Sequence, residues 1–421
     1  MAGHVHIVGA GLAGLSCAVA LAGADVRVTL YEAAGHAGGR CRSWHDADLD
    51  RTIDNGNHLL LSGNSGALDY LRKTGAEGAL AGPAEAILPF HDLASGVRWA
   101  LRPNGGRLPW WLFAPSRRVA RAGAIAHLTG LAALARAPGG ATVAEALGRN
   151  PLYRRLWEPL AVAILNTHAE EASAMLLWRA VRETLGAGGQ ACRPLAARRG
   201  LSDAFVDPAL RTLTTHGADV RFGARLRAVT ADGDRLSTLR FADAEVALAA
   251  GDAAVLAVPP WAAAGILPGL AAPDRHHAIV NAHYRLKRAV ALPGGAPLLG
   301  LVGGTAQWLF SRGDVVSVTV SAADDLAARD GAATAALLWA DVADALGLDR
   351  ETVPPHRIVK EKRATFAQTP QQATRRPGTR TPVANLYLAG DWTDTGLPAT
   401  IEGAIRSGKA AARATIGDSH Y

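Results

Sequence analysis

The sequence predicts an α/β fold of two domains, one of which is assembled from separate parts of the chain. Three observations predict it. An apolar run, His6-Ile7-Val8, breaks into a glycine-rich turn and then into an apolar helical pattern. A second apolar strand at residues 26–31 follows. Near the far end, a strand at residues 385–388 runs into Gly-Asp and then into a last helix. A chain of 421 residues also exceeds one typical hydrophobic core.

The first turn predicts a dinucleotide site. Gly9 allows a tight turn, Gly11 lets the backbone approach a pyrophosphate, and Gly14 lets the helix pack closely on the strand. Leu12 and Ala13 open the helix, whose N-terminus faces the phosphates. A plain loop in a chain rich in Gly and Ala is the alternative. The ordered series of strand, glycines, helix, strand and terminal acid argues against that alternative.

The second strand ends at Glu32, about twenty residues beyond the glycines, where an acid bonds a ribose hydroxyl. Ala33 follows, and then Gly38-Gly39-Arg40, where a loop can lie over a pyrophosphate and Arg40 can pair with it. Nicotinamide enzymes do not need this second loop. The N-terminal segment predicts a dinucleotide. The C-terminal end of the chain is needed to predict which dinucleotide is bound.

That far end contributes Gly390-Asp391 and a helix that begins after Pro398, with Thr400 and Ile401 at its start. Two distant segments that meet on one ligand predict FAD. Asp391 is expected to accept a hydrogen bond from the ribityl chain. The amides after Pro398 are expected to direct the positive end of a helix dipole at the flavin, which stabilises an anionic reduced flavin.

Longer strings resemble a known family. The motifs at Glu32 to Arg40 and Gly390 to Ala404 resemble the flavin amine oxidase and phytoene desaturase superfamily. Four further stretches resemble the hydroxysqualene dehydroxylases, also called squalene-associated FAD-dependent desaturases: residues 54–64, 165–174, 360–366 and 389–403. This resemblance spans nearly the whole chain. It implies an amine oxidase-like flavoprotein of squalene or hopanoid biosynthesis that removes the hydroxyl of hydroxysqualene, an isoprenoid lipid, using reduced FAD.

The expected organisation is a FAD-binding Rossmann-like domain with an inserted α+β substrate domain. Residues 1–58, 196–267 and 378–421 are predicted to form the FAD-binding domain, and residues 59–195 and 268–377 the substrate-binding domain. The second FAD segment reads as strands around a hairpin turn at Asp232 to Asp234. By resemblance, the backbone near Leu226 contacts adenine.

Two histidines are catalytic candidates. Asn57 and His58 follow Gly56 where the chain leaves the FAD domain beside the flavin ring, so His58 could donate a proton or position substrate. The alternative is a histidine that bonds backbone at a domain crossover. His283 lies on a predicted strand that could face the flavin, although a surface or core histidine is the plainer interpretation. We expect no metal site, because the sequence contains no obvious histidine cluster.

Other functions remain open at this point. A carotenoid-type polyene desaturase moves hydride in the opposite direction and needs no acid, whereas a flavin amine oxidase holds a neutral amine beside the flavin. A prenyl-binding protein of the same fold has no need of the redox end of FAD, so the complete Gly390-Asp391 and Pro398 to Glu402 segments count against it. The sequence does not indicate the electron donor.

Composition limits the binding partners and the cellular compartment that we expect for this protein. Lysine and arginine exceed aspartate and glutamate by 44 − 37 = 7, which is too modest and scattered for a nucleic-acid partner. Three separated cysteines fit a reducing compartment. The apolar N-terminus lacks a basic region before it, so we expect a cytoplasmic protein.

One segment suggests peripheral contact with the inner face of a membrane. Residues 110–113, Trp-Trp-Leu-Phe, precede several arginines and then Ile125, Leu128, Leu131 and Leu134 at helical spacing. Aromatic residues, basic residues and an apolar face together are typical of an interfacial anchor. A helix that packs its apolar stripe on the core is the slightly favoured interpretation.

Overall fold

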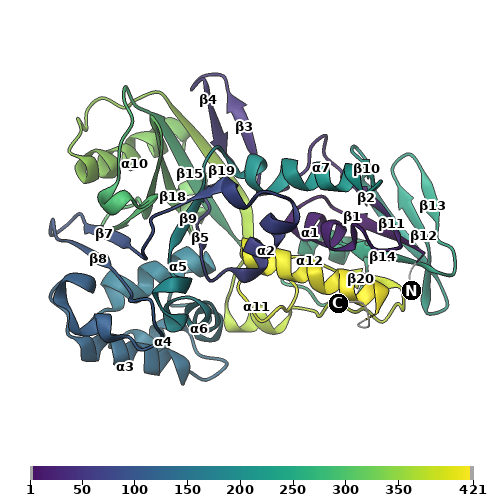
Figure 1. Cartoon of the computed structure of the whole chain (residues 1–421), viewed down its shortest axis with the longest axis horizontal. Coiled ribbons are helices and arrows are strands. Elements are labelled where there is room, and N and C mark those ends of the chain that lie inside the picture. The colour runs from purple at the N-terminus through teal and green to yellow at the C-terminus, as the bar shows by residue number, and fades with distance from the viewer. Residues whose placement is uncertain (1–2, 418–421) are drawn as a thin grey trace.

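The computed structural model describes residues 3–417 and has two halves that lie side by side along the long axis (Figure 1). One half is built on a five-stranded parallel sheet in the order β10-β2-β1-β14-β20. Its strands come from distant parts of the chain: β1 (His4–Val8), β2 (Arg27–Tyr31), β10 (Asp219–Arg221), β14 (Asp252–Leu256) and β20 (Leu386–Leu388).

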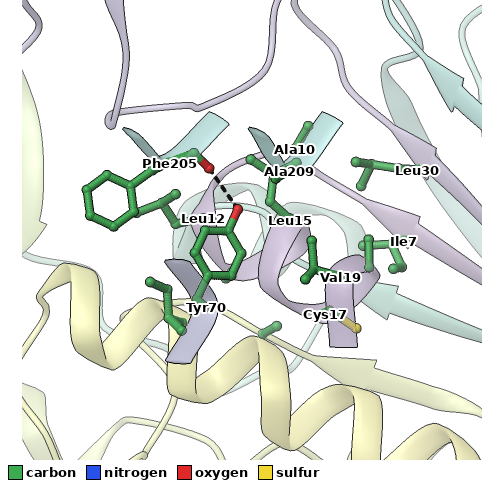
Figure 2. Close-up of a cluster of buried hydrophobic side chains, with 14 of the residues drawn as sticks. Ile7, Ala10, Leu12, Leu15, Cys17, Val19, Leu30, Tyr70, Phe205 and Ala209 are labelled. Atoms are coloured by element: carbon green, nitrogen blue, oxygen red, sulfur yellow. Dashed lines mark hydrogen bonds between the residues drawn. The ribbon is translucent and has the colours of Figure 1, made fainter. Parts of the chain in front are cut away.

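Helices cover one face of this sheet. These are α1 (Leu12–Leu21), α2 (Ser65–Lys73), α7 (Asp207–Thr215) and α12 (Ile401–Ile416). Figure 2 shows the core between them, where Ile7 and Leu30 of the sheet lie beside Leu15 and Val19 of α1. The hydroxyl of Tyr70, from α2, donates a 2.7 Å hydrogen bond to the backbone carbonyl of Phe205. A buried phenol is thus satisfied without breaking the apolar layer.

An antiparallel sheet covers the other face. It consists of β11 (Leu226–Asp232), β12 (Arg235–Phe241) and β13 (Glu245–Ala247). Gly233 has φ +60° at the turn between β11 and β12, so the predicted hairpin is confirmed. Leu239 and Phe241 pack against Val8 and Tyr31 of the parallel sheet.

The other half contains a mixed seven-stranded sheet in the order β19-β15-β18-β17-β16-β7-β8. Its strands are β7 (Leu88–Asp92), β8 (Arg98–Leu101), β15 (His276–Arg285), β16 (Leu298–Val302), β17 (Trp308–Arg312), β18 (Val315–Val320) and β19 (His356–Phe366). The adjoining helices are α3 (Ala124–Ala135), α4 (Val143–Leu147), α5 (Glu158–Leu165), α6 (Ala174–Glu183), α9 (Asp324–Ala328) and α10 (Gly331–Leu346). Helices α3 to α6 gather beneath β7 and β8 in Figure 1.

Short elements connect the two halves. They are β3 (Ser43–Asp46), β4 (Arg51–Asp54), β5 (Leu60–Leu61), β6 (Leu80–Ala81), β9 (Pro194–Ala197), α8 (Pro260–Ile266) and α11 (Pro370–Thr374). The β3–β4 hairpin leads directly into residues 55–58. Strand β9 pairs with both β5 and β6, across the boundary predicted between residues 195 and 196.

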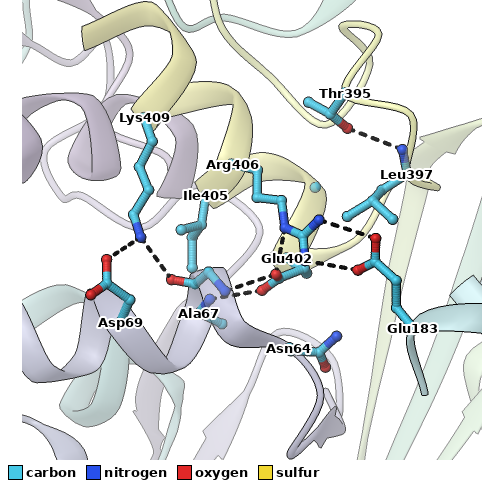
Figure 3. Close-up of polar contacts among 12 residues, drawn as sticks. Asn64, Ala67, Asp69, Glu183, Thr395, Leu397, Glu402, Ile405, Arg406 and Lys409 are labelled. Carbon is cyan, nitrogen blue, oxygen red and sulfur yellow. Dashed lines mark hydrogen bonds and ion pairs between the residues drawn. The ribbon is translucent and has the colours of Figure 1, made fainter. Parts of the chain in front are cut away.

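A polar network fixes α12 against α2 (Figure 3). The buried carboxylate of Glu402 accepts hydrogen bonds from the backbone amides of Gly66 and Ala67, at 2.8 and 2.7 Å, in the first turn of α2. Arg406 donates to Glu402 at 2.7 Å and pairs with Glu183 at 2.8 Å. An anion at a helix N-terminus is favoured by the helix dipole, so the network orients the start of α12. Within residues 3–417, none of the helices is long and apolar enough to cross a bilayer.

Candidate active site

The glycine turn between β1 and α1 uses its three glycines differently. Gly9 has φ +106°, and a Cβ there would lie 2.4 Å from the carbonyl oxygen of Ala257. A Cβ on Gly14 would lie 1.8 Å from the carbonyl oxygen of Gly9. A Cβ on Gly11 would meet no protein atom within 4 Å, outside its chain neighbours. The fold therefore requires glycine at positions 9 and 14, whereas Gly11 borders open space where a ligand can approach the backbone.

Glu32 lies at one end of a row of residues that we call the groove: the glycine turn, residues 38–40, Asp391 and the start of α12. Its carboxylate accepts 2.8 Å hydrogen bonds from the backbone amides of Ala10 and Ala34, which hold it beside the glycine turn at the end of β2. Its backbone bonds Arg221 and Ala224, so the start of β11, at Leu226, lies close by. Ala33 is exposed between the two. Glu32 and Leu226 thus lie at the same end of the groove, as expected for residues around an adenosine.

The loop before β3 lies over the glycine turn. The amide of Gly38 donates a 2.8 Å hydrogen bond to the carbonyl of Ala10, and Gly39 approaches Gly11. Arg40 then forms a 2.8 Å ion pair with Asp391. This pair joins residues that we assigned separately to the pyrophosphate and to the ribityl chain. In the structure their side chains meet.

A second helix N-terminus reaches the groove. The amide of Gly390 donates a 2.6 Å hydrogen bond to the hydroxyl of Ser407, and Thr400 caps α12 by accepting from the amide of Gly403 at 3.1 Å. Pro398 is buried just before the cap, and Ile401 begins the helix. The α12 helix packs on α1 so tightly that a Cβ on Gly408 would lie 2.1 Å from the carbonyl oxygen of Ala13. Since Gly408 is the eighth residue of α12, the start of α12 lies about two turns beyond this contact. Each of the two helices therefore presents the positive end of its dipole at a different point.

A buried arginine, Arg376, lies beside the loop that precedes α12, and the sequence analysis did not predict it as a site residue. The Arg376 side chain is 1% exposed, and its guanidinium donates to the carbonyls of Leu397 at 2.8 Å and of Trp392 at 3.4 Å, and also to that of Thr393. Burial lowers its pKa to about 10, so it remains charged at neutral pH. The exposed carboxylate of Asp394 also lies 4.0 Å from the guanidinium. Arg376 thus orders the loop that precedes α12.

These features fit FAD. Gly11 leaves room for a pyrophosphate, and the N-termini of α1 and α12 provide positive potential along the groove. Glu32 offers acceptors to a ribose, since a carboxylate can accept more than its two present hydrogen bonds. Individual contacts to FAD by these residues remain predictions.

A cavity of about 290 Å³ lies at the junction of the two halves. Asn57 and His58 line it, as do Arg198, Phe310 and Ser317. The other lining residues are mostly small or apolar, apart from the ion-paired Asp54 and Arg312: Ala81, Ala196, Ala197, Leu201, Pro297 and Ser311. Residues of β9, β17, β18 and the segment after β4 therefore line one cavity.

His58 stands between this cavity and the groove. Burial lowers its pKa to about 4, while the charge of Asp54 raises it and that of Arg40 lowers it further. Arg40 belongs to the groove, whereas Asp54 lines the cavity and pairs with Arg312 at 2.6 Å. At neutral pH the imidazole is therefore mostly uncharged, and bringing it to the protonated state costs free energy.

His283 does not line the cavity. It is 1% exposed on β15, and its Nδ1 is 2.7 Å from the hydroxyl of Ser317, which does line the cavity. The Nε2 atom is buried without a hydrogen-bond partner. Burial lowers the pKa of His283 to about 4 as well. His283 is therefore a buried histidine that reaches the cavity through Ser317.

An amide network fixes the segment that carries His58. The side chain of Asn57 donates to Thr319 at 3.1 Å, and Thr319 donates to Asn281 at 2.7 Å. The Asn281 amide donates to the backbone carbonyl of Asn55 at 3.3 Å, and a Cβ on Gly56 would lie 3.3 Å from it. Strands β15 and β18 thereby hold the segment that leaves β4. Sequence analysis missed Asn281, Thr319, Ser317 and Arg312, because nothing in their local patterns distinguishes them from other strand residues.

The suggested membrane segment divides between core and surface. Trp111 and Leu112 are buried, whereas Trp110 is 56% and Phe113 71% exposed. On α3, Leu134 is buried but Ile125 and Leu128 are exposed, and Leu131 is partly buried. The favoured interpretation of a stripe packed on the core was therefore correct for Leu134 and wrong for Ile125 and Leu128. A helix with apolar residues around most of its circumference cannot bury all of them against one neighbour.

Comparison with known proteins identifies the family. Residues 12–416 match the model of the flavin-containing amine oxidoreductases. The chain is 48% identical to a hydroxysqualene dehydroxylase of Rhodopseudomonas palustris, covering 98% of both chains. It is 47% identical to one of Sinorhizobium fredii, covering 99% of both. The solved cyclohexylamine oxidase of Brevibacterium oxydans matches with a TM-score of 0.70, at 17% identity and 99% coverage of both chains. The predicted two-domain α/β flavoprotein fold and the FAD cofactor are confirmed. The chain belongs to the flavin-containing amine oxidoreductases, as an FAD-dependent oxidoreductase of the hydroxysqualene dehydroxylase family.

Proposed function

We propose that this enzyme converts hydroxysqualene to squalene by reductive removal of the hydroxyl group. The observation that carries the proposal is the identity of 47–48% over almost the full length with two proteins named for that activity. In the reaction a C–O bond breaks, a C–H bond forms, and water leaves. Reduced FAD supplies the hydride and becomes oxidised. The chain itself must hold the lipid and provide the proton.

His58 is the proton donor in this proposal. Hydroxide is a poor leaving group in a low-dielectric site, so a proton must reach the departing oxygen. The imidazole lines the cavity, and its pKa of about 4 makes its protonated form a strong acid. Asn57 and Asn281 position its segment, and His283 acts only through Ser317.

The two domains are assigned to the segments that the sequence predicts. Residues 1–58, 196–267 and 378–421 form the FAD-binding domain in this proposal, and residues 59–195 and 268–377 form the substrate-binding domain. The parallel sheet takes its strands from the first group, and the seven-stranded sheet takes all of its strands from the second. Residues 1–2 and 418–421 lie outside the described part of the chain.

The direction of electron flow tests the proposal. Anaerobic addition of hydroxysqualene to dithionite-reduced enzyme is expected to restore the oxidised flavin spectrum and to form one squalene per flavin. A polyene desaturase behaves in the opposite way, because its substrate bleaches the oxidised flavin. Failure of the reduced enzyme to convert hydroxysqualene, together with bleaching by a polyene, would reverse the assignment.

We also propose that the exposed apolar residues around α3 contact the inner face of a membrane rich in anionic lipid. Five of the eight large apolar side chains that are exposed within residues 3–417 lie here: Leu108, Trp110, Phe113, Ile125 and Leu128. Residues 93–144 contain seven arginines and no acidic residue. Arg117 lies over the ring of Trp110, 5.2 Å from its centroid. Apolar side chains set among cations match an anionic bilayer surface, from which a lipid substrate would be drawn.

Replacing Trp110 and Phe113 together by serine is expected to weaken flotation with anionic liposomes by at least about tenfold, since both rings lose apolar contact with lipid. Leu337→Ser is the matched control, because Leu337 is exposed on α10, away from this surface. Trp111 is left intact because it is buried in the core. Equal flotation of the double variant and the control would remove the membrane contact from the proposal.

A further inference from the structure

At the end of the parallel sheet that is opposite the glycine turn, β1 and β14 carry a group of side chains that the flavin chemistry does not use. His4 and His6 are two residues apart on β1, so both point to the same face of the sheet. Asp252 begins β14 and lies directly opposite His4 in the register. Possible ligand atoms of all three residues lie within 4.8 Å of one another.

One atom in this group lacks a partner. His6 is 3% exposed, and its Nδ1 is 3.1 Å from the hydroxyl of Tyr31. Its Nε2 is buried without any hydrogen bond and is directed at Asp252, 3.9 Å from Oδ2. A buried, unpaired ring nitrogen costs free energy unless something occupies the space in front of it.

Neighbouring hydroxyl groups orient both rings. His4 bonds Thr29 through Nε2 at 2.9 Å, which leaves Nδ1 for a ligand. The two rings lie 3.9 Å apart between centroids. Bonds from Thr29 and Tyr31 to the rings correspond to the outer-shell bonds that orient histidine ligands in metal sites.

We propose that His4, His6 and Asp252 form a binding site for a divalent transition-metal ion of the zinc type, which joins β1 to β14. Two imidazoles and one carboxylate are borderline ligands that select zinc, cobalt, nickel or copper over magnesium and calcium. Three protein ligands leave the fourth position to water. The site lies on a face of the sheet, toward the N-terminal ends of β1 and β14, whereas the flavin groove lies beyond their C-terminal ends, so its role is structural and not redox.

The ligand atoms must move closer together to bind a zinc ion. Two nitrogen ligands on a tetrahedral zinc are separated by about 3.3 Å, so donor atoms that now lie within 4.8 Å of one another must approach by up to about 1.5 Å. His4 and Asp252 are partly exposed, and Oδ2 of Asp252 accepts a 2.9 Å hydrogen bond from the amide of Ala249, so Asp252 would bind the ion through a carboxylate that the backbone already orients. The charges of Arg27 and Arg221 oppose a cation at this site, whereas that of Asp252 favours one. A chelator is therefore expected to remove the ion. The sequence analysis expected no metal site because no histidine cluster stands out in the chain; the fold brings the distant Asp252 beside His4 and His6.

Zinc retention by the tag-free, FAD-loaded enzyme tests the proposal. After chelator treatment, incubation with zinc chloride and gel filtration, one zinc per chain is expected, with a rise of a few degrees in Tm. His4→Ala and Asp252→Asn are each expected to lose at least nine-tenths of the zinc and the Tm rise, while keeping FAD. Cobalt is expected to give tetrahedral visible bands in the wild-type enzyme but not in these variants.

The controls remove a histidine and a carboxylate from outside the site. His216→Ala removes an exposed histidine, and Asp219→Asn removes a nearby carboxylate that is not among the three ligands. Both are expected to retain zinc like the wild-type enzyme. Wild-type enzyme without zinc would overturn the proposal, as would undiminished zinc in both His4→Ala and Asp252→Asn. Since the probe is the metal alone and FAD content is followed separately, the result does not depend on the substrate of the enzyme.

Discussion

Gly11→Ala is expected to lower the affinity for FAD by at least about tenfold and to leave the apoprotein folded with almost unchanged stability. A new Cβ at this position meets no protein atom within 4 Å outside its chain neighbours, and the backbone has φ −72°, which alanine adopts freely. The loss of the N-cap glycine of α1 costs less than about 1 kcal/mol. The same methyl group points into the space that a pyrophosphate needs for close backbone approach. A tenfold loss corresponds to about 1.4 kcal/mol.

Two matched variants separate affinity from folding. In Gly14→Ala the Cβ would lie 1.8 Å from the carbonyl oxygen of Gly9, so the apoprotein itself is expected to be destabilised by several kcal/mol. Gly139→Ala adds a methyl group at an exposed position with nothing within 4 Å and should change neither property. Urea unfolding of the apoproteins and titration with FAD measure the two effects. Normal FAD affinity in Gly11→Ala would show that the cofactor does not approach this glycine.

The parts of the fold that sequence predicts are those whose signal is local. Two segments combine a strand, a turn and a helix start within about twenty residues: β1 to α1, and β20 to α12. Glu32 is found by its place at the end of β2. The hairpin between β11 and β12 is local in the same way, because Gly233 supplies the positive φ that its turn requires. Such patterns carry their own spacing and do not depend on the rest of the chain.

The rest of the site arises from contacts across hundreds of residues. Arg40 pairs with Asp391, and Arg312 pairs with Asp54, yet neither sequence segment indicates its partner. Arg376 is enclosed by carbonyls of a loop that follows it, so an arginine in a polar segment becomes a buried cation. Periodicity likewise shows that α3 is apolar but not which of its faces is left uncovered. These arrangements depend on tertiary packing, which single-sequence patterns do not encode.

His58→Ala is expected to slow reoxidation of the reduced enzyme by hydroxysqualene by about 10² to 10⁴-fold, the usual loss when a general acid is removed. The variant should keep FAD, because His58 lines the cavity, and the groove residues Glu32 and Gly11 are untouched. It should also bind the lipid, since only the proton supply changes. Stopped-flow recording of the flavin spectrum in anaerobic single turnover measures the rate, and FAD content and product analysis accompany it.

The pH dependence distinguishes a proton donor from a residue that only shapes the cavity. Burial lowers the pKa of His58 to about 4, so above that value its protonated fraction falls about tenfold for each pH unit. In the wild-type enzyme kcat/KM is therefore expected to fall about tenfold per unit as the pH rises from about 6 to 8. In His58→Ala this slope should vanish along with the rate. His283→Asn is the control, because the pKa of His283 is also about 4 but its ring reaches the cavity only through Ser317; it should keep the slope. If His58→Ala reoxidised at the normal rate, or kept the wild-type slope, the proton would come from elsewhere, while one squalene per flavin would still support the dehydroxylation.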